Sequence, residues 1–260
     1  MSKLNSLQRG FEQPREQHVR YFQLGLRMGL PIAFGYFPTA VAFGVVALAA
    51  GLTGRQTLLM SMFVFSGAGQ FMGVNLVGSG AAPISIIIAN LVINLRYLVM
   101  SASLSRRLRL NCWQAAAIGF GVTDETFIMN YFANPQEVAE GALWAQGEQD
   151  KDILPSSFVL GINLVSYLGW IAGTGAGVVF AGVLPARLTA GMGIVLYAMF
   201  IALLVPSVVK SLAIGVVAVA SGAVCWLLSQ ILPFGWAMVL ATTLIAALGV
   251  WLWGEGVDEL

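Results

Sequence analysis

Charged residues are scarce in this 260-residue chain: Lys and Arg number 13, Asp and Glu 12, and together they make up 10% of the sequence. Hydrophobic residues make up 58%. A soluble domain typically carries about a quarter charged residues, because water must solvate its surface. So few charges exclude a water-soluble fold for most of the chain. The net charge of +1 also provides no field that would attract nucleic acid.

Cysteine and histidine are almost absent. Cys112 and Cys225 lie in separate apolar segments and form no CxxC spacing, which argues against a disulfide framework or a thiolate metal site. His18, the only histidine, lies in the polar N-terminal stretch, so we expect no histidine-based metal site or catalytic dyad among the apolar segments. Walker A, GxSxG and HExxH motifs are also missing, so neither an enzyme nor a bound cofactor is expected. No short apolar stretch with a cleavage site precedes the first long segment, so no removable signal peptide is expected.

Long apolar stretches fill the rest of the sequence. They cover about residues 29–50, 57–78, 83–104, 112–132, 158–182, 188–206, 209–229 and 234–253. Each is close to the roughly 20 residues that a helix needs to cross a bilayer. Uninterrupted apolar runs do not fit the alternating pattern of a membrane β-barrel. The sequence therefore predicts an all-α integral membrane protein, a bundle of seven or eight transmembrane helices with at least one broken or re-entrant helix.

The polar stretches divide the chain. We expect a basic cytoplasmic tail (1–28), a single transmembrane transporter domain (29–253) and an acidic tail (254–260). Within the domain, halves 29–132 and 158–253 are joined by a polar loop, 134–157. Transporters are often built from repeated halves, but these two show no convincing sequence match, so a repeat is left open.

Basic residues in short loops predict which ends of the segments face the cytoplasm. The N-terminal tail carries five, and the turn after residue 104 carries Arg106, Arg107 and Arg109, so both should be cytoplasmic. Three apolar segments separate them, whereas two cytoplasmic ends require an even number of crossings. Either the rule fails here, or one segment enters and leaves on the same side; we expect the latter. Segment 112–132 should then cross outward, leaving the acidic loop 134–157 outside.

Two segments contain residues that break helices. The first holds Pro31, Gly35 and Pro38, and the second holds Ser66-Gly67-Ala68-Gly69 at its middle. Proline removes a backbone donor, and glycine lowers helix propensity by about 1 kcal/mol relative to alanine. We therefore expect a break near 31–38 or near 66–70, buried in protein or lining water as membrane depth requires. Close packing of unbroken helices is the alternative at each site.

Intramembrane charges are confined to two places. Arg96 lies within segment 83–104, where a charge costs about 2.5–3.5 kcal/mol on insertion scales. Asp124 and Glu125 are the only acids between residues 17 and 136. We expect Arg96 to pair with one of them, and the other acid is a candidate for loading a proton. Arg96 reaching out to the lipid headgroups is the alternative.

A break near residue 66 would expose backbone groups that can bind a carboxylate and an ammonium group, aided by the positive end of a half-helix. Asn94 shares one helix face with Asn90 and Tyr97, where these residues either line a path or hydrogen-bond across helices. The predicted substrate-binding residues are Pro38, Ser66, Gly67, Ala68, Gly69, Gln70, Asn94 and Arg96. A second set, Gly169, Gly173 and Gly177, recurs every four residues and predicts close helix packing, within this chain or with another.

Taken together, these motifs resemble the AzlC family, the large subunit of branched-chain amino acid exporters. The resemblance rests on Gly35-Tyr36-Phe37-Pro38, on Ser66 to Phe71, on Asn94-Leu95-Arg96-Tyr97, on Thr123-Asp124-Glu125-Thr126-Phe127, and on Trp170 with Gly173-Thr174 and Gly177. It covers roughly residues 25–230. Order and spacing of the motifs make it far more specific than any motif alone.

The resemblance implies an exporter of valine, leucine, isoleucine and sometimes methionine in the bacterial plasma (inner) membrane. It also implies a small AzlD-like membrane subunit as partner and proton-coupled antiport. Tyr97 stands where members of the family often have histidine, and a tyrosine with an unperturbed pKa of about 10 cannot replace a histidine relay near neutral pH. The coupling ion is therefore left open. A permease or channel for another small solute and a non-transporting assembly scaffold are the competing functions.

Overall fold

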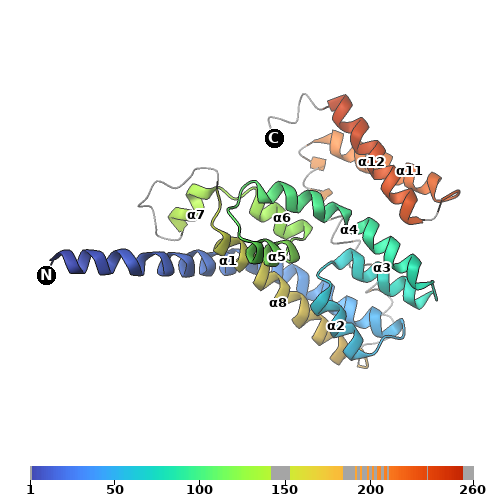
Figure 1. Ribbon diagram of the computed structural model, residues 1–260. Helices are drawn as coiled ribbons and strands as arrows, with labels where there is room; N and C mark the ends of the chain where they lie inside the picture. The colour runs from blue at the N-terminus through green and yellow to red at the C-terminus, as the bar shows by residue number, and fades with distance from the viewer. Residues whose placement is uncertain are drawn as a thin grey trace.

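The computed structural model describes residues 2–141, 153–183, 211–232 and 234–253, with scattered positions between 191 and 209. The expected segment 188–206 lies largely outside these residues, as do residues 142–152 of the loop 134–157 and the acidic tail. The described part is helical and contains no strand, only one isolated bridge between Leu108 and Leu154. Its helices are α1 (Ser2–Ala49), α2 (Gly54–Phe63), α3 (Gly67–Gly78), α4 (Pro83–Ser105), α5 (Cys112–Phe120), α6 (Asp124–Tyr131), α7 (Pro135–Gly141), α8 (Ser156–Phe180), α11 (Leu212–Leu228) and α12 (Phe234–Trp253) (Figure 1).

Helix α1 runs without interruption through Pro31 and Pro38, so of the two places considered for a break, 31–38 has none. Proline is tolerated inside a membrane helix where neighbouring helices and Ser or Thr side chains satisfy the freed backbone. Pro38 leaves the Phe34 carbonyl without its usual helical donor, and the next carbonyl, that of Gly35, accepts from the Thr39 hydroxyl at 3.4 Å. Helix α8 packs along the same stretch, and this contact overrides the local breaking tendency.

Helices α1 and α8 run parallel at very short range. A Cβ atom built on Gly173 would lie 2.5 Å from the Phe37 carbonyl oxygen, and one on Gly177 would lie 2.3 Å from that of Val41. Residue numbers rise together along both helices, which fixes the parallel direction. The stripe Gly169, Gly173 and Gly177 therefore has its partner helix within this chain. Only glycine lets two helix backbones approach this closely.

Helices α2 and α3 form a hairpin that enters and leaves at one end of the bundle. The helix stops at Phe63 and starts again at Gly67, so the main chain is broken at residues 64–66, next to the predicted place. Gly78 at the end of α3 lies beside Ala50, which precedes α2: a Cβ on Gly78 would be 3.2 Å from the Ala50 Cβ. Segment 57–78 is therefore re-entrant, and the expectation of at least one broken helix is confirmed.

Helices α5 and α6 form a second hairpin, which the sequence reasoning missed. The chain leaves helical geometry at residues 121–123 and begins α6 at Asp124. Arg107, just before α5, donates to the carbonyl of Tyr131, the last residue of α6. It also donates, at 2.9 Å, to the carbonyl of Ala133, which follows α6. Segment 112–132 thus returns to the end at which it started, and the expected outward crossing is wrong.

The two hairpins enter from opposite ends of the bundle. Helix α4 connects them and, at 23 residues, spans about 34 Å. Figure 1 shows α2 and α3 at one end of α4, with α5, α6 and α7 toward the other. Because neither hairpin crosses, segments 57–78 and 112–132 supply no crossing, and the seven or eight transmembrane helices expected are not confirmed. The first residues of the acidic loop 134–157 therefore lie at the same end of the bundle as the arginine-rich turn, Arg106 to Arg109.

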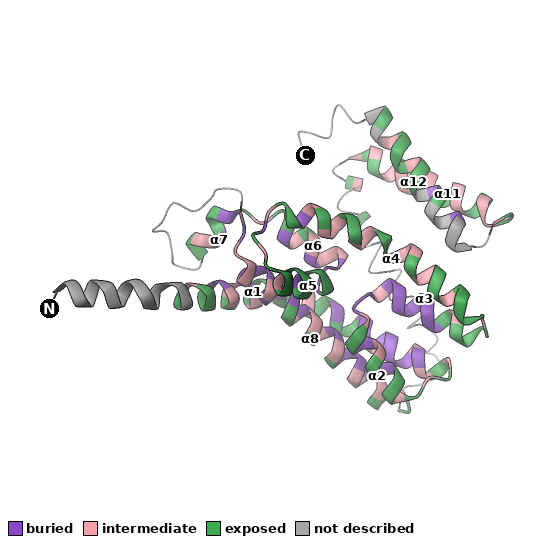
Figure 2. Ribbon diagram, viewed as in Figure 1, coloured by how far each residue is buried: buried purple, intermediate pink, exposed green. Residues whose placement is uncertain are grey.

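Three helices of the described part are long and apolar enough to span a bilayer: α4, α8 and the portion Glu16–Ala49 of α1. Half of the most apolar window in α1 and in α8 is buried, against 6% in α4. Buried residues gather on α1, α3 and α8, where the hairpins pack (Figure 2). Helices α11 and α12 pack against each other, and α12 also contacts α4. An apolar outer face needs no protein cover in lipid, which is as apolar as leucine.

The hairpin arrangement predicts which loops share a side of the membrane. With both native cysteines replaced by serine, cysteines at the exposed positions Arg55 and Ser79 should react with a membrane-impermeant maleimide from one side. Cysteines at Arg106 and Gln136, also exposed, should react only from the other side. Labelling of Arg106→Cys and Gln136→Cys from opposite sides would contradict the re-entrant course of α5 and α6.

Candidate functional site

The break between α2 and α3 ends in a capped half-helix. Ser66 has extended dihedral angles, φ −145° and ψ 98°, and its hydroxyl accepts a hydrogen bond from the Gly69 amide at 3.3 Å. Serine is a favoured N-cap because it supplies an acceptor to an amide that the helix cannot satisfy. The amides of Gly67 and Ala68 have no partner within the helix, and they form the positive end of α3.

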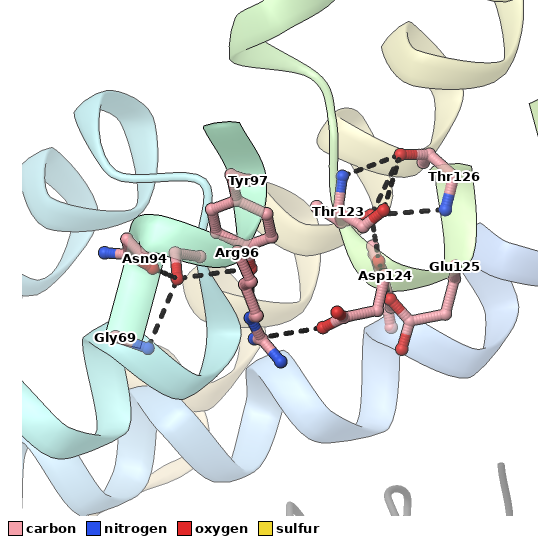
Figure 3. A network of polar contacts seen from close by, with 10 residues as sticks. Gly69, Asn94, Arg96, Tyr97, Thr123, Asp124, Glu125 and Thr126 are labelled. Atoms are coloured by element: carbon pink, nitrogen blue, oxygen red, sulfur yellow. Dashed lines mark hydrogen bonds and ion pairs between the residues drawn. The ribbon is translucent and has the colours of Figure 1, made fainter. Parts of the chain in front are cut away.

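The second break has the same construction. Thr123 caps α6: its hydroxyl accepts from the Thr126 amide at 3.3 Å, while the Thr126 hydroxyl accepts from the Thr123 amide at 2.8 Å (Figure 3). Asp124 and Glu125 occupy the first turn, where acids are stabilised by the helix dipole. In the sequence, two threonines three residues apart, Thr123 and Thr126, enclose two acids. This pattern is the signal that would have predicted a helix start at residue 124.

Both half-helix N-termini border one cavity. Its volume is about 20 Å³, close to the space that a single water needs. Five parts of the chain contribute to it: α1, the two breaks with the starts of α3 and α6, α4, and α8. The lining residues are Tyr36, Phe65, Gly67, Ala68, Arg96, Tyr97, Thr123, Asp124, Glu125 and Trp170.

An ion pair closes one side of the cavity. Arg96 Nη2 lies 3.0 Å from Asp124 Oδ2, and the two side chains are 33% and 20% exposed (Figure 3). The same Nη2 donates to the Tyr97 hydroxyl at 3.3 Å, and the guanidinium carbon lies 5.1 Å from the centre of the Tyr97 ring. Arg96 therefore turns into the bundle rather than toward the headgroups. Of the two acids predicted as partners, the structure selects Asp124.

Glu125 is held separately, by α1. The Tyr36 hydroxyl donates to Glu125 Oε2 and lies 2.6 Å from the Thr123 hydroxyl oxygen. The Tyr36 ring meets Trp170 edge to face, with centroids 5.6 Å apart. The sequence singled out Tyr36 and Trp170 only as members of the family motifs and predicted no role for them. The structure places both on the cavity wall.

Three buried polar atoms around the cavity have no hydrogen-bond partner in the described part of the chain: Arg96 Nε, Trp170 Nε1 and Glu125 Oε1. Two of them are donors and one is an acceptor, and leaving such a group unpaired typically costs about 1–3 kcal/mol. A ligand that carries both an anionic and a cationic group offers partners to all three.

The other predicted binding residues do not line the cavity. Ser66 and Asn94 lie just behind the cavity wall, with the Ser66 hydroxyl donating to Asn94 Oδ1 at 2.7 Å and lying 3.4 Å from the Tyr97 oxygen. Gly69 faces Asn94 closely, since a Cβ there would lie 3.1 Å from Asn94 Nδ2. Pro38 is exposed and does not line the cavity, so its part in substrate binding stays a prediction.

Gln70 does not line the cavity either. Its side chain is fully buried among α2, α3 and α8 and donates to the Ser61 hydroxyl at 3.2 Å. The amide that was expected to face a substrate therefore lies behind the cavity.

The sequence was compared with known protein families and proteins. The family described as AzlC protein matches residues 31–184, more than half of the chain. The chain belongs to the AzlC family. The matched range contains every residue that lines the cavity, so the two hairpins are part of what the family shares in sequence.

Relatives of the AzlC family chain are membrane proteins by name. An uncharacterised membrane protein of Archaeoglobus fulgidus is 29% identical, covering 72% of this chain and 75% of the relative. The branched-chain amino acid transport protein AzlC of Bacillus subtilis is 25% identical, covering 75% and 71%. The inner membrane protein YgaZ of Escherichia coli is 26% identical, covering 92% and 94%. No solved structure matches the chain.

The ion pair predicts a non-additive effect on stability. Arg96→Ala leaves the Asp124 carboxylate among protein atoms without its cation, which is more costly than removing both charges. The single variant should therefore melt below the double variant Arg96→Ala/Asp124→Ala in detergent, by a few degrees for about 1 kcal/mol. A double-mutant cycle with additive changes would show that the pair contributes no coupling energy.

Proposed function

We propose that this chain is the transport subunit of a plasma-membrane exporter for valine, leucine, isoleucine and methionine. The observation that carries the proposal is the cavity between two half-helix N-termini. Among the described residues, donors on Arg96 and Trp170 and an acceptor on Glu125 have no hydrogen-bond partner there. The name of the Bacillus subtilis relative supplies the substrate class. An amino acid is a zwitterion, and it therefore carries the two charges that these groups complement.

The substrate carboxylate is proposed to bind at the start of α3, where the amides of Gly67 and Ala68 and the Arg96 guanidinium supply donors. The ammonium group would bind the free oxygen of Glu125. Phe65 and Trp170 offer apolar surface on the same wall to an aliphatic side chain. Such a division into a few fixed polar groups and an apolar remainder is typical of small-molecule sites.

Transport requires the cavity to open, because about 20 Å³ does not hold an amino acid. The hairpins enter from opposite ends of the bundle and meet at this cavity. We therefore propose that each hairpin gates one side, α2–α3 at one end and α5–α6 at the other. Broken helices around a central site are a recurring feature of transporters with alternating access.

Membrane orientation is proposed from the same geometry. Two crossings, α1 and α4, separate the basic N-terminal tail from Arg106, Arg107 and Arg109, so both can face the cytoplasm as the loop charges favour. Proton-coupled antiport and a small AzlD-like membrane subunit complete the proposed transporter. Glu125 is the candidate proton carrier, because a carboxyl group withdrawn from water favours its neutral form.

Leucine counterflow in proteoliposomes tests the substrate class. Vesicles that contain this chain and the small subunit, loaded with unlabelled leucine, should accumulate labelled leucine, whereas vesicles loaded with lysine should not. Arg96→Ala should weaken leucine binding by about 30-fold, from roughly 2 kcal/mol for a lost charged hydrogen bond. Tyr131→Phe, on the far end of α6 and outside the cavity, is the matched control. Non-saturating flux of leucine and lysine alike would favour a channel instead.

Glu125→Gln separates binding from coupling. Glutamine keeps a side-chain oxygen for the substrate ammonium but cannot release a proton near neutral pH. Leucine exchange should persist, while the rate should no longer respond to an imposed pH gradient across pH 6–8. Asp124→Asn, which removes the carboxylate that pairs with Arg96, should lower exchange itself. A full gradient response in Glu125→Gln would assign the coupling step to another group.

A further inference from the structure

A cluster of neutral oxygens lies behind the cavity, where α2, α3 and α8 meet. Ser61 from α2, Gln70 from α3 and Thr174 from α8 are each 0% exposed. Gln70 Nε2 lies 3.2 Å from the Ser61 hydroxyl oxygen, which in turn lies 2.8 Å from that of Thr174. None of the three lines the cavity. The cluster joins the first hairpin to α8 through side chains.

The number of hydroxyl protons fixes which atom donates in each of these hydrogen bonds. The Thr174 hydroxyl donates to the carbonyl of Trp170 at 3.0 Å, so its only proton is used. Ser61 must then donate to Thr174, and Gln70 donates to Ser61. Every hydroxyl proton is occupied, while Gln70 Oε1 is buried without a partner in the described part. The cluster therefore has more hydrogen-bond acceptors than donors.

The surrounding backbone has the same polarity. Helix α2 ends at Phe63, two residues after Ser61, and the carbonyl end of a helix carries a partial negative charge. Of the carbonyls in its last turn, Met60 accepts from the Val64 amide and Met62 from the Tyr167 hydroxyl at 2.7 Å. The cluster contains no acidic residue, so it lacks the carboxylates that calcium sites use. Hard neutral oxygens at a half-helix C-terminus suit a monovalent cation.

We propose that Ser61, Gln70 and Thr174 bind a sodium ion. The ion would accept the free lone pairs of the two hydroxyl oxygens and of Gln70 Oε1, with the end of α2 adding negative potential. Bound there, it would hold α2 and α3 against α8 and so fix the position of the first hairpin. The site is separate from the cavity, and its existence does not depend on the identity of the transported substrate.

Thermal melting of the full chain in detergent tests this site directly. At constant ionic strength, sodium chloride should raise the melting temperature over choline chloride by about 2–4 °C at roughly five times the dissociation constant. The increase should saturate with concentration, and potassium chloride should give a smaller one. Equal melting in sodium and choline, the result expected for a buried water, would overturn the proposal, as would an equal increase with potassium.

Variants assign the effect to these side chains. Gln70→Leu and Thr174→Val should lose the sodium increment, and Thr174→Ser, which retains the hydroxyl, should keep it. Ser166→Ala is the matched control: Ser166 is also buried on α8 and donates to the carbonyl four residues earlier, at 2.8 Å. It should keep the increment. Loss of the increment in Ser166→Ala, or its retention in Thr174→Val, would remove the site from this cluster. A sodium effect without leucine counterflow would leave this site standing and refute the proposed function.

Discussion

Broken main chain at membrane depth must find its hydrogen-bond partners inside the protein, and this constraint governs the structure. Lipid offers none, and each unsatisfied backbone group costs several kcal/mol there. Both breaks meet the requirement with one hydroxyl residue, Ser66 before α3 and Thr123 before α6. The caps use one amide each, and the starts of both half-helices border the same cavity. The cavity is therefore bordered by the positive ends of two helices.

The charges of the site follow from these helix ends. Asp124 and Glu125 lie at the positive end of α6, which stabilises acids, and each then acquires a partner from another helix, Arg96 or Tyr36. Helix α3 has no acid in its first turn, so its positive end remains available. The two half-helices are thus built alike and differ in charge. That difference gives the cavity one side suited to an anion and another suited to a cation.

Sequence reasoning succeeded where a residue type had few alternatives. Glycines at 67 and 69 made a break near residue 66 predictable, and the isolation of Arg96 made its pairing with an acid predictable. It left 31–38 open as a place for a break, although packing on α8 holds α1 helical at Pro31 and Pro38. It missed the break at 121–123, because the acids there were considered only as charges. Tyr36 and Trp170 carry no local pattern that separates them from the other aromatic residues of a chain that is 11% aromatic.

The packing of the bundle indicates which parts can move. Helices α1 and α8 meet backbone to backbone at glycines such as Gly173 and Gly177, and such a contact offers no alternative arrangement nearby. The α5–α6 hairpin tip is held differently, through the Arg96–Asp124 pair and the Tyr36–Glu125 hydrogen bond. Under the proposed function, a zwitterionic substrate presents the same kinds of charge that these contacts join and competes with them for partners. The α1–α8 pair is therefore the fixed frame, and the hairpin tips are the elements on which the proposed substrate would act.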